Sequence, residues 1–171
     1  MEIVNIPKER VAILIGEEGK TKERIEKRTG VKLEIRDGEV TLEGSEEKVY
    51  FAKDIIKAIG RGFKPGRALL LAKDDYSFVL ISLKDYYHTK SSIRRIKGRI
   101  IGEEGKIRKE IEVATDSYLS IYGHTVGIIA KYDTIAFAEE AIHKLIGGCE
   151  HSTLINYLSD VRKTVFNKRL V

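Results

Sequence analysis

The chain has 171 residues, of which 42% are hydrophobic and 33% charged, as is typical of a globular protein with one domain or two small ones. Its apolar runs are shorter than the ~18 residues that span a bilayer, and MEIVNIPKER lacks the basic start and apolar core of a signal peptide. The formal net charge of +5 and the pI near 9.2 favour an anionic partner. The one cysteine, Cys149, allows no internal disulfide and indicates a cytoplasmic protein. No histidine has zinc-ligand spacing with Cys149, so we expect neither a metal nor a cofactor.

The first 62 residues predict the element order β-α-α-β-β-α. EIVNI (2–6) indicates a short strand, and PKERVAIL indicates a helix with Pro7 in its first turn, where the missing N–H costs nothing. After a glycine joint, KTKERIEKRTG predicts a second helix that Gly30 ends. KLEIR and EVTLE, on either side of DG, predict a β-hairpin. Ser45 can then cap a last helix, whose inner face carries Val49, Ala52, Ile56 and Ile59.

The second half predicts the same order again, after a connector in which RALLLA can form one or two helical turns. The expected strands cover 78–83, 118–122 and 126–130, and the expected helices cover 91–100, 106–115 and 133–146. A tail helix follows over 152–166, with Ser152 as its N-cap and one apolar face, formed by Leu154, Leu158, Val161 and Val165.

The two halves are copies of one unit. With a shift of 86 residues, 14–62 align with 100–148 without a gap, and about a third of the positions are identical. The longest identical run is IGEEGK, at 15–20 and 101–106. Such self-similarity indicates a duplicated domain.

Each copy has the pattern Gly-x-x-Gly between its first two helices. As a plain helix–helix turn, such a joint needs glycine only for its positive φ. The repetition of the motif, the lysine after it, and the hairpin and helix that follow favour a binding role. Without Cβ atoms at Gly102 and Gly105, a phosphate can approach the main chain, and the next helix offers N–H groups and the positive end of its dipole.

This combination resembles the KH domain of the eukaryotic type, in which the glycine joint clamps about four nucleotides. The resemblance implies that bases turn onto an apolar groove beside the second joint, although ordinary core is an alternative role for its residues: Ile100, Ile101, Ile107, Ile111 and 119–121. The resemblance implies an α+β fold of two tandem type I KH domains, each β-α-α-β-β-α, plus a C-terminal helix. The implied segments are a first KH domain (1–62), a connector (63–75), a second KH domain (76–148) and a helical tail (149–171).

Basic residues are more abundant around the second joint than around the first. We therefore predict that the main RNA-binding surface consists of Arg94, Arg95, Lys97, Arg99, Ile100, Ile101, Gly102, Glu103, Glu104, Gly105, Lys106, Arg108 and Lys109. A secondary RNA-binding or partner surface is predicted at Gly16, Glu17, Glu18, Gly19, Lys20 and Lys22.

The paired glutamates depart from the Lys or Arg that KH loops usually carry. Two carboxylates repel a phosphate unless they point to solvent, and acids at a helix N-terminus also stabilise the helix through its dipole. Glu103 and Glu104 therefore fit a role in the fold as well as a place in the clamp.

A longer stretch, IRRIKGRIIGEEGKIRKEIEVATDSYLSIYGHTVGII followed by GCEHSTLINYL, is similar to one particular family. It resembles the archaeal counterpart of the ribosome-assembly protein called partner of Nob one, which is Krr-like. This resemblance implies a protein that binds single-stranded rRNA near the 3′ end and acts in small-subunit rRNA processing and ribosome assembly. It also implies two protein partners, the Nob-type endonuclease and the alpha subunit of translation initiation factor two.

Two other function classes stay open. A protein-interaction scaffold with degenerate KH loops is supported by the glutamate pairs. A ribonuclease needs a general acid and base, or a carboxylate cluster for a metal, whereas the carboxylates here are scattered over predicted helices. We expect an RNA-binding protein that is not an enzyme.

Overall fold

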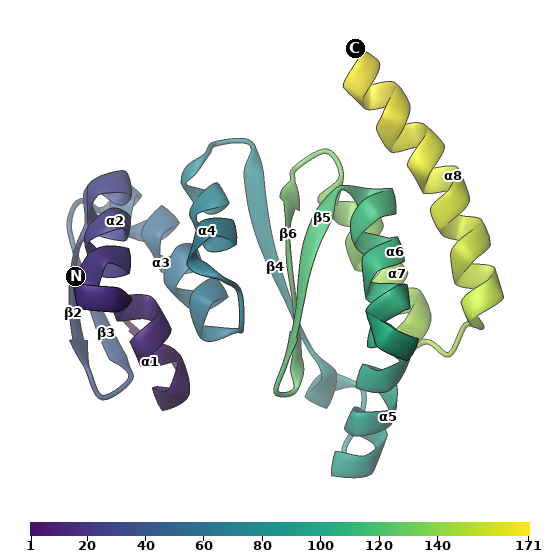
Figure 1. Cartoon of the computed structure of the whole chain (residues 1–171), viewed down its shortest axis with the longest axis horizontal. Coiled ribbons are helices and arrows are strands. Elements are labelled where there is room, and N and C mark those ends of the chain that lie inside the picture. The colour runs from purple at the N-terminus through teal and green to yellow at the C-terminus, as the bar shows by residue number, and fades with distance from the viewer. The chain divides into compact units, whose positions relative to one another are not determined.

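The computed structural model describes residues 1–171, which form two compact units, Met1–Phe78 and Val79–Val171 (Figure 1). The strands form two three-stranded sheets, in the orders β1-β3-β2 and β4-β6-β5. The helices and strands of each unit follow the order that the sequence predicts, so the expected α+β fold is confirmed. None of the helices combines the length and apolar character needed to cross a membrane.

The first unit contains the predicted β-α-α-β-β-α order. Its elements are β1 (Glu2–Asn5), α1 (Lys8–Ile15), the 3-10 turn η1 (Glu17–Gly19), α2 (Lys20–Thr29), β2 (Lys32–Arg36), β3 (Glu39–Glu43) and α3 (Glu46–Gly60). The β2–β3 hairpin turns at Asp37 and Gly38, both with positive φ, as an Asp-Gly turn between two strands requires. Buried apolar side chains of the sheet meet those of the helices in one core, which includes Leu14, Ile25, Leu33, Leu42, Ile55 and Ile59.

The connector belongs structurally to the first unit. Its predicted helical turns are α4 (Pro65–Ala68) and η2 (Leu69–Ala72), both of which pack on α3. Phe63, Ala68 and Leu71 are buried there.

The second unit repeats the order and adds a long helix. Its elements are β4 (Tyr76–Ser82), η3 (Leu83–Asp85), α5 (Lys90–Ile101), η4 (Glu103–Gly105), α6 (Lys106–Thr115), β5 (Ser117–Tyr122), β6 (Thr125–Lys131), α7 (Ile135–Ile146) and α8 (His151–Leu170). A capping box between Thr89 and Ser92 begins α5. Helices α5, α6 and α7 cover one face of the sheet (Figure 1).

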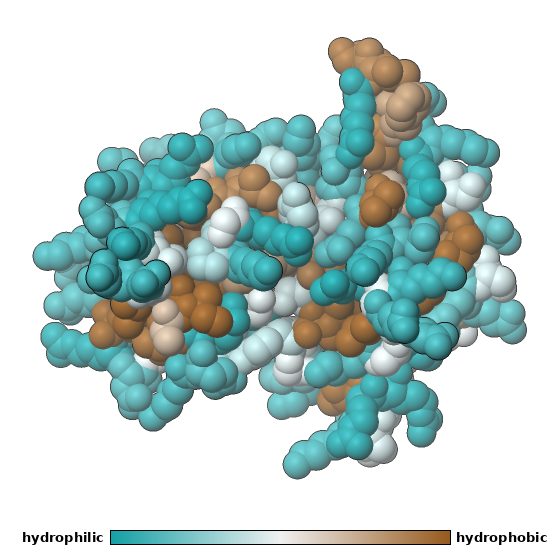
Figure 2. All heavy atoms as spheres, viewed as in Figure 1, coloured by the Kyte–Doolittle hydropathy of each residue, from teal (hydrophilic) through white to brown (hydrophobic).

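Helix α8 packs on α6 and α7 through its predicted apolar face, since Leu154, Leu158, Val161 and Val165 are all buried. Polar contacts fix the same interface: Arg162 pairs with Glu110 at 3.1 Å and Arg169 pairs with Asp116 at 2.7 Å. The Tyr157 hydroxyl donates to Glu140 at 3.0 Å, and burial together with this carboxylate raises the pKa of Tyr157. Hydrophilic residues cover most of the face in Figure 2, whereas apolar atoms gather at the C-terminal end of α8, where Phe166 and Leu170 are exposed.

Three expected helix starts differ in detail. Pro7 is the N-cap of α1 and lies just before its first turn. Ser45 occupies the N-cap position of α3, but its side chain makes no capping hydrogen bond. Ser152 lies inside α8, because the helix begins one residue earlier, at His151, with Glu150 as its N-cap.

The duplication extends further than the sequence alignment suggested. At the last aligned position, the shift of 86 residues pairs Gly62 with Gly148, which have φ of 98° and 92°. It also pairs Lys64 with Glu150, the N-caps of α4 and α8, which share φ of −68° and extended ψ. The α4–η2 segment is therefore the short counterpart of the 20-residue helix α8.

Candidate nucleic-acid interface

The two glycine joints have the same backbone conformation. The first glycine of each, Gly16 or Gly102, has φ near 73° and ψ of 176°, and the second glycine, Gly19 or Gly105, has φ of 75°. In each joint the second glycine's N–H donates to the first glycine's carbonyl at 3.2 Å. Identical IGEEGK sequences thus fold identically in two different units.

The two glycines of a joint have different physical roles. A Cβ on Gly102 would lie 2.5 Å from Cγ1 of Ile107, and a Cβ on Gly16 would lie 2.2 Å from Oγ1 of Thr21. A Cβ on Gly105 or Gly19 would meet no atom within 4 Å. The first glycine is therefore needed for packing inside the unit, and the second is the one that leaves room for an outside chain.

Another glycine with open space at the position of a Cβ atom lies one helical turn before the second joint. Gly98 on α5 is exposed, and a Cβ there would also meet nothing within 4 Å. The first unit has Ala12 at the equivalent position. The sequence reasoning missed Gly98, because the alignment of the two copies begins two residues later, at residues 14 and 100.

The glutamates of the second joint point to solvent. Glu103 and Glu104 are exposed and form no ion pair, and Glu104 has a left-handed backbone with φ of 54°. Two of the N–H groups expected to face a ligand are used within the joint, because Gly105 and Lys106 donate to the carbonyls of Gly102 and Glu103. The attraction for an anion here must therefore come mainly from the dipole of α6 and from nearby side chains.

Unpaired cations lie on α5 and α6, the two helices that the second joint connects. None of the following side chains has a hydrogen bond or ion pair within the protein: Arg94, Arg95, Lys97, Lys106 and Lys109. At the first joint, by contrast, Lys20 pairs with Glu18 at 3.3 Å and Lys22 with Glu26 at 4.0 Å. The two joints thus differ in the number of basic residues nearby and also in how many of those residues lack an ion pair.

Arg108 lies on the side of α6 that faces strand β5. One turn later on that side, Glu112 accepts a hydrogen bond from the Leu119 N–H of β5 at 2.9 Å. Arg108 is half-buried, and its Nε is fully shielded from solvent without a hydrogen-bond partner. A buried donor without a partner is costly, so this Nε contributes nothing to the stability of the fold, and a ligand could contact Arg108 only through the terminal nitrogens of its half-buried guanidinium.

Two predicted contact residues are turned away from solvent. Ile100 has no exposed surface and belongs to the core of the second unit, so it supports the groove from beneath. The Arg99 guanidinium donates to the carbonyl of Leu145 at 3.2 Å and to that of Cys149, and His151 lies 3.1 Å from the Arg99 carbonyl. Arg99 thus anchors the segment that leads from α7 into α8, and both residues leave the proposed contact surface.

The first unit has the same anchor on a different helical turn. Arg10 donates to the carbonyl of Ile59 at 2.8 Å and to that of Phe63 at 2.9 Å. These carbonyls are the copies, 86 residues earlier, of those that Arg99 contacts. The repeated arrangement identifies the anchor as part of the fold.

Helix α8 contributes to a hollow beside the second joint. The hollow has a volume of about 470 Å³ and is lined by Glu103, Lys106, Ile107, Glu110, His151, Ser152 and Ile155. The tail therefore borders the candidate interface, which was not expected from the sequence.

Comparison with known proteins supports this description of the two units. Residues 77–163 match the family model for the second KH domain of PNO1, described as a eukaryotic-type KH domain (type I), and residues 1–58 match the KH-domain model. The chain is 43% identical to a KH domain-containing protein of Methanocaldococcus jannaschii, covering 99% of this chain and 77% of the relative.

Solved structures from Pyrococcus horikoshii are similar over almost the whole chain. Dim2p matches with 41% identity and a TM-score of 0.85, covering 93% of this chain and 98% of that one. A chain of the a/eIF2alpha–aDim2p–rRNA complex matches with 40% identity and a TM-score of 0.88, covering 95% and 94%. The pre-rRNA-processing protein PNO1 of Chaetomium thermophilum is 28% identical over 74% of this chain, which spans about half (49%) of the fungal protein.

Proposed function

Because the chain belongs to the archaeal PNO1/Dim2 family of type I KH-domain proteins, we propose that it binds single-stranded small-subunit rRNA near the 3′ end and acts in rRNA processing. The second unit is the main RNA surface in this proposal. The first unit is secondary there, or contacts a protein.

One observation carries the assignment of the surface. Five cations with no partner inside the protein lie on α5 and α6, the helices on either side of the second glycine joint, whereas the lysines of the first joint are paired with glutamates. An unpaired cation gives up no internal contact when it binds a phosphate. Binding of a polyanion should therefore be more favourable in free energy at the second joint than at the first.

The geometry suggests how the chain of a nucleic acid would lie. Its sugar–phosphate backbone would pass the open main chain at Gly98 and Gly105, with Lys106 and Lys109 at the start of α6 beside it. Bases would turn toward β5, where Tyr118 is partly exposed and Arg108 is half-buried. Exposed Glu103 and Glu104 can extend into solvent, away from the phosphates.

The rRNA target and the partners are proposed from the relatives. The fungal relatives are named pre-rRNA-processing proteins, and one similar structure is a complex of a/eIF2alpha, aDim2p and rRNA. We accordingly propose the alpha subunit of translation initiation factor two and a Nob-type endonuclease as partners of this chain.

The test is fluorescence anisotropy with a labelled RNA that copies the 3′ end of small-subunit rRNA, over a salt series. The variant Arg94→Glu with Arg95→Glu should weaken binding about tenfold or more at low salt and reduce the slope of log K against log salt by about 1.4, since each lost phosphate contact in a single strand contributes about 0.7. The matched control, Lys20→Glu with Lys22→Glu, makes the same charge change at the first joint and should have a smaller effect. A larger effect of the control would reverse the assignment of the two units.

The same samples test the rival functions. If the wild-type chain does not bind RNA at low salt, the RNA proposal is wrong and the result supports the scaffold function. Cleavage products would point to a ribonuclease, although the structure brings together no group of three or more His, Cys, Asp or Glu side chains that could hold a metal.

A further inference from the structure

We propose that the first unit has a second phosphate-binding site, in a basic hollow between α2 and the α4–η2 segment, which contacts single-stranded RNA. The inference rests on the proposed RNA-binding function and adds to it a contact surface separate from both glycine joints.

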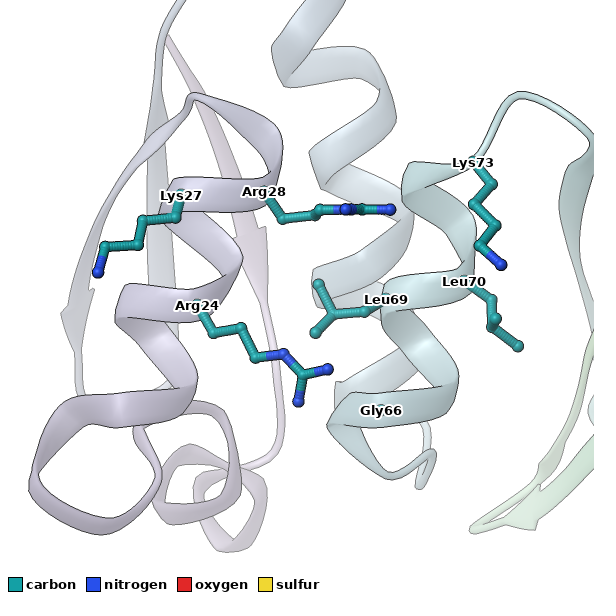
Figure 3. Close-up of a pocket in the computed structure, with 7 residues that line it drawn as sticks. All are labelled: Arg24, Lys27, Arg28, Gly66, Leu69, Leu70 and Lys73. Carbon is teal, nitrogen blue, oxygen red and sulfur yellow. The ribbon is translucent and has the colours of Figure 1, made fainter.

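The hollow is lined by cations and by no acidic residue. It has a volume of about 510 Å³, and its lining consists of Arg24, Lys27, Arg28, Gly66, Leu69, Leu70 and Lys73. Figure 3 shows Arg24 and Arg28 projecting from α2 toward α4 and η2, while the Lys27 ammonium points the other way. Lys27 pairs with Glu23 at 2.7 Å, so the two arginines are the main charges of the hollow.

The arginines of α2 lack the ion pairs that its other charges have. Side chains four residues apart on a helix are neighbours, and α2 uses this spacing for the pairs Lys22–Glu26 and Glu23–Lys27. Arg24 and Arg28 have the same spacing but the same charge, and neither has a hydrogen bond or ion pair inside the protein. Like charges at this spacing repel, and an anion between them converts the repulsion into attraction.

The hollow lies on a different side of α2 from the groove of the glycine joint. Glu26 marks the side of α2 that faces strand β2, because its carboxylate accepts from the Leu33 N–H at 2.8 Å. Arg24 and Arg28 are each two residues away from Glu26, which places them about 160° around the helix. A ligand in the hollow would not occupy the groove.

The equivalent surface of α2 and α6 has different residues and different neighbours in the two units. The copies of Arg24 and Arg28 in the second unit are Glu110 and Ala114. Glu110 pairs with Arg162 of α8 at 3.1 Å, and Ala114 is fully buried. In the first unit the counterpart of α8 ends after eight residues, at Ala72, and both arginines are exposed. The surface that is closed by a helix in one unit is open and cationic in the other.

The chemistry of the lining favours phosphate over a protein helix. A helix that docks in a groove needs a row of apolar contacts, and this hollow offers only Leu69, which is 8% exposed, and Leu70. Guanidinium groups match phosphate oxygens in a two-pronged geometry, and Lys73 supplies a further positive charge. The moderate basic charge of the whole chain is consistent with this choice.

The test uses the full chain and an oligouridylate of about 30 nucleotides, several times the four that one glycine joint clamps. The variant Arg24→Glu with Arg28→Glu should weaken binding about tenfold and lower the salt slope by about 1.4. The control is Lys32→Glu with Lys48→Glu, which makes the same charge change at two exposed, unpaired lysines of the first unit outside the hollow. The control should lower the salt slope by less than half as much.

The outcomes separate this site from the proposed function. If the Arg94/Arg95 variant loses binding while the Arg24/Arg28 variant binds as wild type, the hollow is not an RNA site and the proposed function stands. If the wild-type chain binds no RNA, both fail. Equal losses in the Arg24/Arg28 variant and its control would assign the effect to net charge and overturn the proposal. Binding of a poly-glutamate peptide that requires Arg24 and Arg28, with RNA affinity unchanged, would overturn it in favour of an acidic protein partner.

Discussion

The two glycines of the second joint illustrate how one motif combines a structural and a functional requirement. Gly102 has φ of 72° and ψ of 176°, a region that only glycine occupies readily, and it packs against Ile107. Gly105 has φ of 75° and ψ of 16°, a left-handed conformation that asparagine tolerates, with open space beside it.

Substitutions at these two positions should therefore separate stability from binding. Gly102→Ala should lower the free energy of unfolding by about 1–3 kcal/mol, because it adds both backbone strain and a clash. Gly105→Asn should change it by less than about 1 kcal/mol and still weaken RNA binding, because its side chain fills the space that the nucleic acid needs. Chemical denaturation and anisotropy of the same samples measure both quantities. Unchanged RNA affinity of Gly105→Asn would contradict the proposed path of the backbone.

A substitution at Arg108 should also separate RNA binding from stability, because RNA affinity should fall while stability is kept or raised. Its shielded Nε has no partner in the protein, so replacing it by methionine, which has a similar shape and no donor, removes an unsatisfied group. We expect Arg108→Met to leave the free energy of unfolding unchanged or raise it by about 1 kcal/mol, while RNA affinity falls several-fold. Arg99→Met is the comparison, since Arg99 has carbonyl partners and its loss should destabilise the second unit. A loss of stability in Arg108→Met would mean that this side chain serves the fold.

At the scale of elements, the regular parts of the fold could be predicted from local patterns. The period-two alternation around Asp37 and Gly38 predicted the hairpin, and the apolar spacing of 154–165 predicted the buried face of α8. Both patterns reflect forces between residues that are close in the sequence, which is why they were readable without a structure.

The parts that could not be predicted depend on contacts between distant residues. Arg99 looked like one more cation of an RNA surface, but its partners lie 46 and 50 residues later. The hollow of the first unit required knowing that α4–η2 packs beside α2, and the hollow beside η4 required knowing where α8 begins. The cation count at the joints suggested which unit is the more basic, whereas the pairing of Lys20 and Lys22 became visible only in the structure.

At the scale of the whole molecule, the chain has two cores of the same design. Ile25 and Ile111 occupy equivalent positions, both with no exposed surface, one in each core. Each unit encloses its own apolar residues, as the cluster around Ile111, Leu119 and Ile142 shows for the second.

Truncating these two isoleucines should therefore affect one unit at a time. Ile25→Ala and Ile111→Ala should each destabilise their own core by about 2–5 kcal/mol. Native-state hydrogen exchange should show lost protection mainly in 1–78 for the first variant and mainly in 79–171 for the second. Equal loss of protection in both units from either variant would show that the chain unfolds as a single cooperative body.

In each unit an arginine of the first helix, α1 or α5, holds carbonyls at and just beyond the C-terminal end of the third helix, α3 or α7, and this has a consequence for comparing the copies. Arg10 and Arg99 contact matching carbonyls, yet Arg10 aligns with Ile96 and Arg99 aligns with Ile13. An alignment position by position would count two unrelated Arg/Ile mismatches. In the structure the two units share one arginine–carbonyl contact, and the arginine has moved by about one helical turn. In a diverged tandem repeat, the two carbonyls that accept the hydrogen bonds can thus stay the same while the sequence position of the arginine that donates to them changes.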